Sequence, residues 1–302
     1  MKKTFLESLH CPFCNKPLQT KREFWGTKLE ITNGIVGCSC SSYPIISNVL
    51  FLAKDGNTKK ALRFIKKHQN LASKYPEIPF FLLRLPENLL FIVPFFVRIN
   101  IFKNLTFREF VRLATHLRVI NKDWSQYLLK RYSRADFSGA KKAAKLVRTG
   151  FRVLDAGCGA GHLLSLLTKR FKASHLVGID KSLLNIYMAA KYLGRGSNLV
   201  YLNIEDPLPF SDKFFNMVIS NDVLSYISNK KLLANEIKRI LEAEGLVALT
   251  NLNNKQFADS FKTPPPHALA FGDYIKLFPK FEAKTLKGSE KTRSFSIAFK
   301  KS

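Results

Sequence analysis

The sequence has few acidic residues and no long uninterrupted apolar run. Aspartate and glutamate number 22 against 49 lysines and arginines in 302 residues, which gives a net charge of +27. A positive field of that size favours anionic partners and disfavours a cationic substrate. The most apolar stretch, residues 78–102, is interrupted by charged residues and prolines and falls short of the roughly 20 residues that span a bilayer. We therefore expect no transmembrane segment.

The N-terminus lacks the apolar core of a secretory signal, because charged residues occur among the first seven positions. We expect a cytoplasmic, reducing location, with association at a membrane surface as a further option. Hydrophobic residues make up 46% of the chain, which is enough for a core and excludes a disordered or fibrous protein. The length suits one α/β domain with an accessory segment.

Cysteine is almost confined to the first 40 residues. Two close pairs, Cys11 with Cys14 and Cys38 with Cys40, are separated by 23 residues, and Cys158 lies far downstream. In a reducing compartment such thiolates suit tetrahedral zinc, and free or redox-active thiols are the alternative. Four protein ligands leave no open position on the metal, so we predict a structural zinc site.

The sequence around the pairs includes the run of residues 9–18 and, after the second pair, Tyr43-Pro44-Ile45. It resembles the small zinc-ribbon family whose members partner methyltransferases or are fused to them. In that family the second pair is normally Cys-x-x-Cys, whereas here it is Cys38-Ser39-Cys40. We assign residues 1–56 to this ribbon.

Residues 57–139 are predicted to form a basic, mainly helical linker or lid. Residues 57–150 contain 20 basic and five acidic residues, a net charge of +15. This charge suits RNA phosphates or anionic lipid headgroups, and a purely compositional origin is the alternative. The phenylalanine- and leucine-rich residues 80–102 have three interpretations: a buried packing layer, a surface that enters a membrane or an apolar substrate, or a platform for RNA bases.

A short apolar strand, an acidic residue and a glycine-rich loop follow one another at residues 152–164. Glycine lets the backbone turn tightly and approach a ligand, and the amides of the following helix donate to it. Asp155 precedes Gly157, Gly159 and Gly161, in place of the Gly-x-Gly-x-x-Gly spacing of dinucleotide folds. The pattern therefore provides a carboxylate for a positively charged ligand.

This string resembles the first motif of class I S-adenosylmethionine-dependent methyltransferases, of the methyltransferase type 11 kind. The resemblance covers residues 140–302 and implies a Rossmann-like α/β domain with a seven-stranded mixed sheet. It places strands near residues 176–180, 199–204, 214–224 and 246–251, a helix at 232–241, a turn at 244–245, and a closing antiparallel pair at 281–286 and 295–300.

The resemblance also implies S-adenosylmethionine as cofactor and assigns residues to it. Asp180, at the end of the second strand, matches the acid that accepts hydrogen bonds from both ribose hydroxyls. Asn203 and Ile204 match the adenine-binding turn, where the family usually has aspartate at the first position. Ser220 and Asn221, at the end of the fourth strand, complete the expected cofactor set.

Methyl transfer from a sulfonium is an in-line displacement in which positioning does most of the work and a base is optional. The fourth strand is not followed by an Asn-Pro-Pro-Tyr sequence, and residues 220–227 resemble small-molecule methyltransferases. A small or amphiphilic acceptor is therefore expected. Tyr226 and His267 are the candidate catalytic residues, with packing or an inert loop position as the alternatives, and His162 is expected to pack near the methionine moiety.

Three other functions stay open at this point. The order of ribbon and methyltransferase resembles ribosomal RNA guanine-N1 methyltransferases, which would make RNA the acceptor. The same fold transfers aminopropyl groups in polyamine synthesis, although the basic charge disfavours a cationic acceptor. A noncatalytic scaffold that binds RNA or a membrane is the third.

Overall fold

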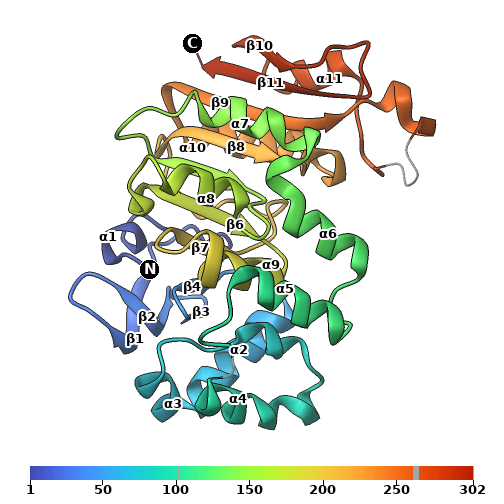
Figure 1. Cartoon of the computed structure of the whole chain (residues 1–302). Helices are drawn as coiled ribbons and strands as arrows, with labels where there is room; N and C mark the ends of the chain where they lie inside the picture. Colours follow the sequence, from blue (N-terminus) through green and yellow to red (C-terminus); the bar gives the residue numbers. More distant parts are fainter. Residues whose placement is uncertain (101, 261–264, 302) are drawn as a thin grey trace.

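The computed structural model describes residues 1–100, 102–260 and 265–301, and a mixed sheet of 11 strands runs through it. The strand order is β1-β2-β3-β4-β7-β6-β5-β8-β9-β11-β10 (Figure 1). The strands are β1 (Gln19–Gly26), β2 (Ile31–Gly37), β3 (Ser42–Ile46), β4 (Val49–Phe51), β5 (Val153–Ala156), β6 (Leu176–Asp180), β7 (Asn198–Tyr201), β8 (Phe215–Asn221), β9 (Leu241–Asn253), β10 (Phe281–Lys287) and β11 (Ser294–Lys301).

Helices connect the strands and cover the sheet. The α-helices are α1 (Lys3–Leu6), α2 (Gly56–Lys67), α3 (Gln69–Lys74), α4 (Val93–Ile99), α5 (Phe107–His116), α6 (Lys122–Lys130), α7 (Ser138–Ala144), α8 (His162–Thr168), α9 (Leu183–Met188), α10 (Lys230–Ile240) and α11 (Phe271–Ile275). The short 3-10 and π segments are η1 (Phe80–Arg84), η2 (Glu87–Ile92), η3 (Arg131–Ser133), η4 (Ala135–Phe137), η5 (Ala173–His175), η6 (Ala189–Leu193), η7 (Leu224–Tyr226) and η8 (Lys255–Ser260).

The sheet has more strands than the predicted seven. Strands β5 to β11 supply seven, in the order β7-β6-β5-β8-β9-β11-β10, and the N-terminal segment adds β1 to β4. Parallel pairing of β4 with β7, with Leu50 opposite Val200, joins the two parts. Without β4, strand β7 would be an open edge with unpaired backbone groups, and covering it removes that liability. The prediction of a seven-stranded sheet is therefore corrected to 11.

Side chains alternate between the two faces of the sheet and build two cores. On β5, Val153 belongs to one core and Leu154 to the other, as the two-residue period of a strand requires. The first core also receives the helices of the middle region. The second contains the N-terminal segment, including Leu9 and Cys11, together with the rings of Phe210 and Phe215. The N-terminal segment thus packs into the same cores as the α/β part.

The elements described between residues 57 and 139 are all helical. The packing interpretation of residues 80–102 holds for part of this segment. Phe80 is buried, with its ring 5.3 Å from Phe51 of β4 and 5.3 Å from Tyr187 of α9. The packing interpretation therefore holds for η1, whereas Phe91 and Phe95 are exposed. No helix within the described residues is long and apolar enough to cross a membrane.

The chain between α10 and β9 differs from prediction. The sequence predicts a helix at residues 232–241, but α10 ends at Ile240, and Leu241 begins β9 and pairs with Phe215. The predicted turn at residues 244–245 lies inside the strand as an irregularity, with Glu244 at a φ of 57°. The residues between Leu241 and Leu246 form a bulge, because β9 pairs with β8 at Leu241 and again at Leu246.

Candidate functional site

The glycine loop lies between β5 and α8, as predicted. Gly157, Gly159 and Gly161 have φ angles of 84°, 54° and 89°. The Gly157 amide donates to the Ile179 carbonyl at 2.9 Å, so the loop rests on the end of β6. A Cβ on Gly157 would come within 2.5 Å of a Val223 methyl group, which makes glycine necessary there for space as well as for conformation.

Replacing Gly157 with alanine is expected to weaken binding of S-adenosylhomocysteine on the order of tenfold, because the clash with Val223 shifts the loop. Gly150→Ala is the matched control: Gly150 has a similar φ of 86°, and a Cβ there meets nothing within 4 Å. Calorimetry should find nearly wild-type affinity in the control. Equal losses in both variants would show that backbone strain, rather than the clash, is responsible.

Two carboxylates lie at the ends of the central strands. The Asp180 carboxylate accepts from the Gly159 and Ser182 amides, both at 2.8 Å, and therefore fixes the glycine loop to β6. Asp155 is buried, and its Oδ2 has no hydrogen-bond partner among the described residues. Burial and then repulsion from Asp180 raise the pKa of Asp155 to about 8, while Arg131 opposes the shift.

A small cavity of about 60 Å³ lies against the loop. Its wall includes Asp155, Gly157, Gly159 and Asn221 from the predicted cofactor set, and its other side is formed by α6 and the segment after it. The contributing residues on that side are Trp124, Tyr127, Leu128, Arg131 and Phe137. The α6 helix and the segment after it therefore line the cavity opposite the glycine loop.

Arg131 anchors this side of the cavity. Only 2% of the residue is exposed, and its guanidinium pairs with Asp136 at 2.9 Å and with Asp222 at 3.2 Å. Asp222 also accepts from the Tyr127 hydroxyl at 3.2 Å and from the Asn251 side-chain amide at 2.8 Å. The network joins α6 and the segment after it to the ends of β8 and β9.

Sequence reasoning missed Arg131 and Asp222. Arg131 stands in a run of basic residues, and no local pattern separates a buried guanidinium from exposed neighbours. The position of Asp222 could have indicated a functional role, because this acid directly follows an apolar strand and stands beside Asn221, a predicted cofactor-binding residue.

The remaining predicted cofactor residues are spread along the same edge of the sheet. Asn203 is half-buried, and its side-chain carbonyl accepts from the Glu205 amide at 3.3 Å, whereas Ile204 is buried. The Ser220 hydroxyl donates to the Ala156 carbonyl at 2.9 Å, which ties β8 to β5. Asn221 accepts from the Thr250 hydroxyl at 2.8 Å.

Tyr226 and His267 come from distant parts of the chain to the same place. Tyr226 is 53% exposed, and the His267 amide donates to the carbonyl of neighbouring Ser225 at 3.1 Å. Pro264, also part of the predicted covering loop, lies outside the described residues. His162 is buried against α6, 2.9 Å from the Leu128 carbonyl, and burial lowers the pKa of His162 to about 4.

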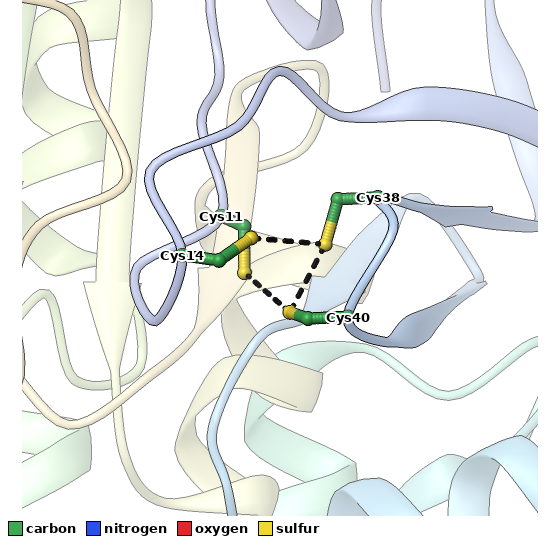
Figure 2. Close-up of side chains that lie close together, drawn as sticks. All are labelled: Cys11, Cys14, Cys38 and Cys40. Atoms are coloured by element: carbon green, nitrogen blue, oxygen red, sulfur yellow. Dashed lines mark hydrogen bonds between the residues drawn. The ribbon is translucent and has the colours of Figure 1, made fainter.

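The two cysteine pairs meet in one cluster. Figure 2 shows the four side chains converging from two loops, one after α1 and one between β2 and β3. The Sγ atoms of Cys11 and Cys40 are 3.6 Å apart, those of Cys14 and Cys38 3.5 Å, and those of Cys38 and Cys40 3.2 Å. All four lie within 4.8 Å of one another. Tetrahedral zinc with bonds of about 2.3 Å separates its sulfurs by about 3.8 Å, so the cluster fits this metal.

Comparisons with known proteins agree with the geometry of the loop. Residues 148–276 match a family model described as "Methyltransferase domain". A malonyl-[acyl-carrier protein] O-methyltransferase of Ilyobacter polytropus is 26% identical over 131 residues, which cover 42% of this chain and 48% of that protein. A demethylmenaquinone methyltransferase of Lactobacillus johnsonii is 28% identical over 178 residues, 57% of this chain and 68% of that protein.

A solved structure also resembles part of the chain. A TehB-like S-adenosylmethionine-dependent methyltransferase of Corynebacterium glutamicum superposes with a TM-score of 0.45 and 18% identity, covering 60% of this chain and all of that one. Matches to two malonyl-[acyl-carrier protein] O-methyltransferases span 48% and 38% of their lengths. Residues 148–276 thus resemble a methyltransferase domain, and the relatives compared with them are methyltransferases.

Proposed function

We propose that this chain transfers the methyl group of S-adenosylmethionine to a small or amphiphilic acceptor by in-line displacement. The observation that carries the proposal is the buried Asp155 oxygen without a partner, beside a loop of three glycines. A positively charged ligand would supply the missing partner. When bound, the cofactor provides a methyl group already activated on its sulfonium sulfur.

The chain's own residues would bind and position the reactants. Asp180 would hold the ribose, Asn203 and Ile204 the adenine, and the glycine loop the methionine part. The cavity of about 60 Å³ is far smaller than the roughly 300–1,000 Å³ of small-molecule sites, so α6 has to move when a ligand enters. In this structure Gly157 and Gly159 remain partly exposed beneath α6.

The acceptor class rests on the names of the relatives and on the absence of a base-methylating motif. Relatives named for malonyl-[acyl-carrier protein], demethylmenaquinone or ubiquinone biosynthesis favour a small or amphiphilic acceptor, whereas two others are named for ribosomal protein L11. The test is to incubate the protein with methyl-labelled cofactor and a cell extract separated into RNA, protein, lipid and metabolite fractions. Label in the lipid or metabolite fraction supports the proposal. Label in the RNA fraction would make RNA the acceptor instead. Cofactor binding without label in any fraction favours a scaffold.

Binding of S-adenosylmethionine is expected to strengthen as pH rises from 6 to 8. A cation at Asp155 favours the ionised carboxylate, and the raised pKa of about 8 leaves Asp155 protonated below that pH. Affinity should therefore fall by up to about tenfold per pH unit below pH 8 and level off above it. Calorimetry between pH 6 and 9 measures this slope. Asp155→Asn should remove it, and a slope that persists in that variant would assign the titration elsewhere.

Tyr226 and His267 are proposed to face the acceptor. Tyr226→Phe and His267→Ala are each expected to slow methyl transfer about tenfold or more while leaving S-adenosylhomocysteine affinity unchanged. The transfer rate is measured on the labelled fraction and the affinity by calorimetry. An unchanged rate would return the residue to a packing or inert role, and a loss of affinity would move it to the cofactor site.

We also propose that Cys11, Cys14, Cys38 and Cys40 hold one structural Zn²⁺. The proposal is supported by four converging thiols of one chain and by the chemistry of the donor set. The metal would tie the loop after α1 to the loop between β2 and β3, and its binding would add to the free energy of folding.

A further inference from the structure

A helical face formed by η2 and α4 exposes large apolar side chains. Leu89, Phe91, Phe95 and Ile99 are 40%, 73%, 59% and 48% exposed. The last three follow one another at intervals of four residues from η2 into α4, so they share a side of the helix. Val93 and Val97 of the same helix are buried, so the helix is already packed on its other side. These four side chains form the exposed apolar face.

A concavity of about 570 Å³ adjoins this face through Pro94 and Arg98 of α4. Its charged lining consists of Lys66, Lys67, Lys74 and Arg98, and it contains no carboxylate. Within the described residues none of the four cations has an ion pair. They stand in the last turns of α2, α3 and α4, where the helix dipole favours positive charge. We call this the cationic concavity.

The surrounding charge keeps this concavity positive. His68 also lines it, and burial, followed by Lys67 and Arg98, lowers the pKa of His68, so the ring adds little charge near neutral pH. Glu87, the acid nearest in sequence to the apolar face, is paired with Arg63 at 2.5 Å. An anion entering the concavity would thus meet four cations and no lining carboxylate.

We propose that the exposed apolar face and the cationic concavity together dock on an anionic lipid bilayer. The apolar side chains enter the boundary between headgroups and acyl chains, while the concavity takes acidic headgroups beside them. Figure 1 shows α3 and α4 at the end of the molecule away from β10 and β11, where a flat surface can reach them. The proposal does not depend on the proposed transfer reaction.

RNA fits the same surface less well. Single-stranded RNA stacks its bases on aromatic rings within a basic groove. Here the rings share their face with Leu89 and Ile99, which offer no stacking surface, and the cations lie to one side rather than among the rings. Aliphatic and aromatic side chains next to a cluster of lysines are what an interfacial membrane helix requires.

Vesicle sedimentation tests the proposal with the whole chain. Wild-type protein is expected to bind phosphatidylcholine vesicles containing phosphatidylglycerol, to bind pure phosphatidylcholine much less, and to be partly released by 0.5 M salt. The double variant Phe91→Ser, Phe95→Ser should reduce binding about tenfold or more. A Lys66→Gln, Lys67→Gln, Lys74→Gln variant should lose most of the preference for the anionic lipid.

The matched control is the double variant Leu29→Ser, Leu232→Ser, which removes exposed apolar side chains from other surfaces and should bind like wild type. All variants should keep wild-type affinity for S-adenosylhomocysteine, which separates loss of docking from loss of folding. No binding to the anionic vesicles, or equal binding by wild type and the Phe91/Phe95 variant, would overturn the proposal. Displacement of the vesicles by mixed-sequence RNA, with the RNA held through the same phenylalanines, would make the surface an RNA site instead.

Discussion

Replacing Asp180 with alanine is expected to weaken binding of S-adenosylhomocysteine on the order of 100-fold or more. Hydrogen bonds to a charged group contribute about 1.5–3 kcal/mol each, and the carboxylate is proposed to accept two from the ribose. The substitution also removes the acceptor that holds the Gly159 amide at 2.8 Å, so the loop loses an anchor. Calorimetry measures the affinity, and the labelled-cofactor assay should show a parallel loss of transfer.

Two controls separate the role of Asp180 from general damage. Asp180→Asn keeps one acceptor oxygen for the loop or the ribose and should retain part of the affinity. Asp212→Ala removes an acid whose side chain is 72% exposed and pairs with Arg239. This variant should bind S-adenosylhomocysteine with normal affinity. A folded Asp180→Ala protein with wild-type affinity would refute the ribose assignment.

Loss of one ligand from the cysteine cluster is expected to lower the melting temperature on the order of 10 °C. Metal binding contributes to folding free energy directly, and about 5 kcal/mol corresponds to roughly 10–20 °C in large domains. Cys40→Ser is the informative change, because Cys40 is exposed and its replacement removes little packing. The effect should extend beyond the ribbon, since β4 pairs with β7 in the same sheet. Thermal unfolding followed by circular dichroism measures it.

Metal analysis and chelation complete this test. Freshly purified wild-type protein should contain one zinc per chain and lose stability with a strong chelator, whereas Cys40→Ser should show no further loss. Ser39→Ala, next to Cys40 and also exposed, is the matched control and should melt like wild type. Wild-type protein without zinc, or a Cys40→Ser variant as stable as Ser39→Ala, would contradict the zinc proposal.

Several parts of the molecule depend on local chemistry and could be predicted from the sequence. Gly157 and Gly161 take positive φ angles that other residues adopt with strain, so their spacing after an apolar strand predicts the loop directly. Asp180 was predicted because it ends the strand after the glycine loop, where the resemblance to class I methyltransferases implies an acid. The cysteine pairs were predictable because each lies within a few residues of the chain.

The contacts between distant segments depend on packing that no local sequence pattern specifies. Pairing of β4 with β7 merges the ribbon with the larger sheet, and no local pattern specifies which edge strand it covers. The pair between Arg131 and Asp222 joins residues 91 positions apart, and burial of its guanidinium depends on the packing of α6. The same holds for the phenylalanines of residues 80–102, because their composition is uniform and only packing against β4 and α9 separates buried Phe80 from exposed Phe91.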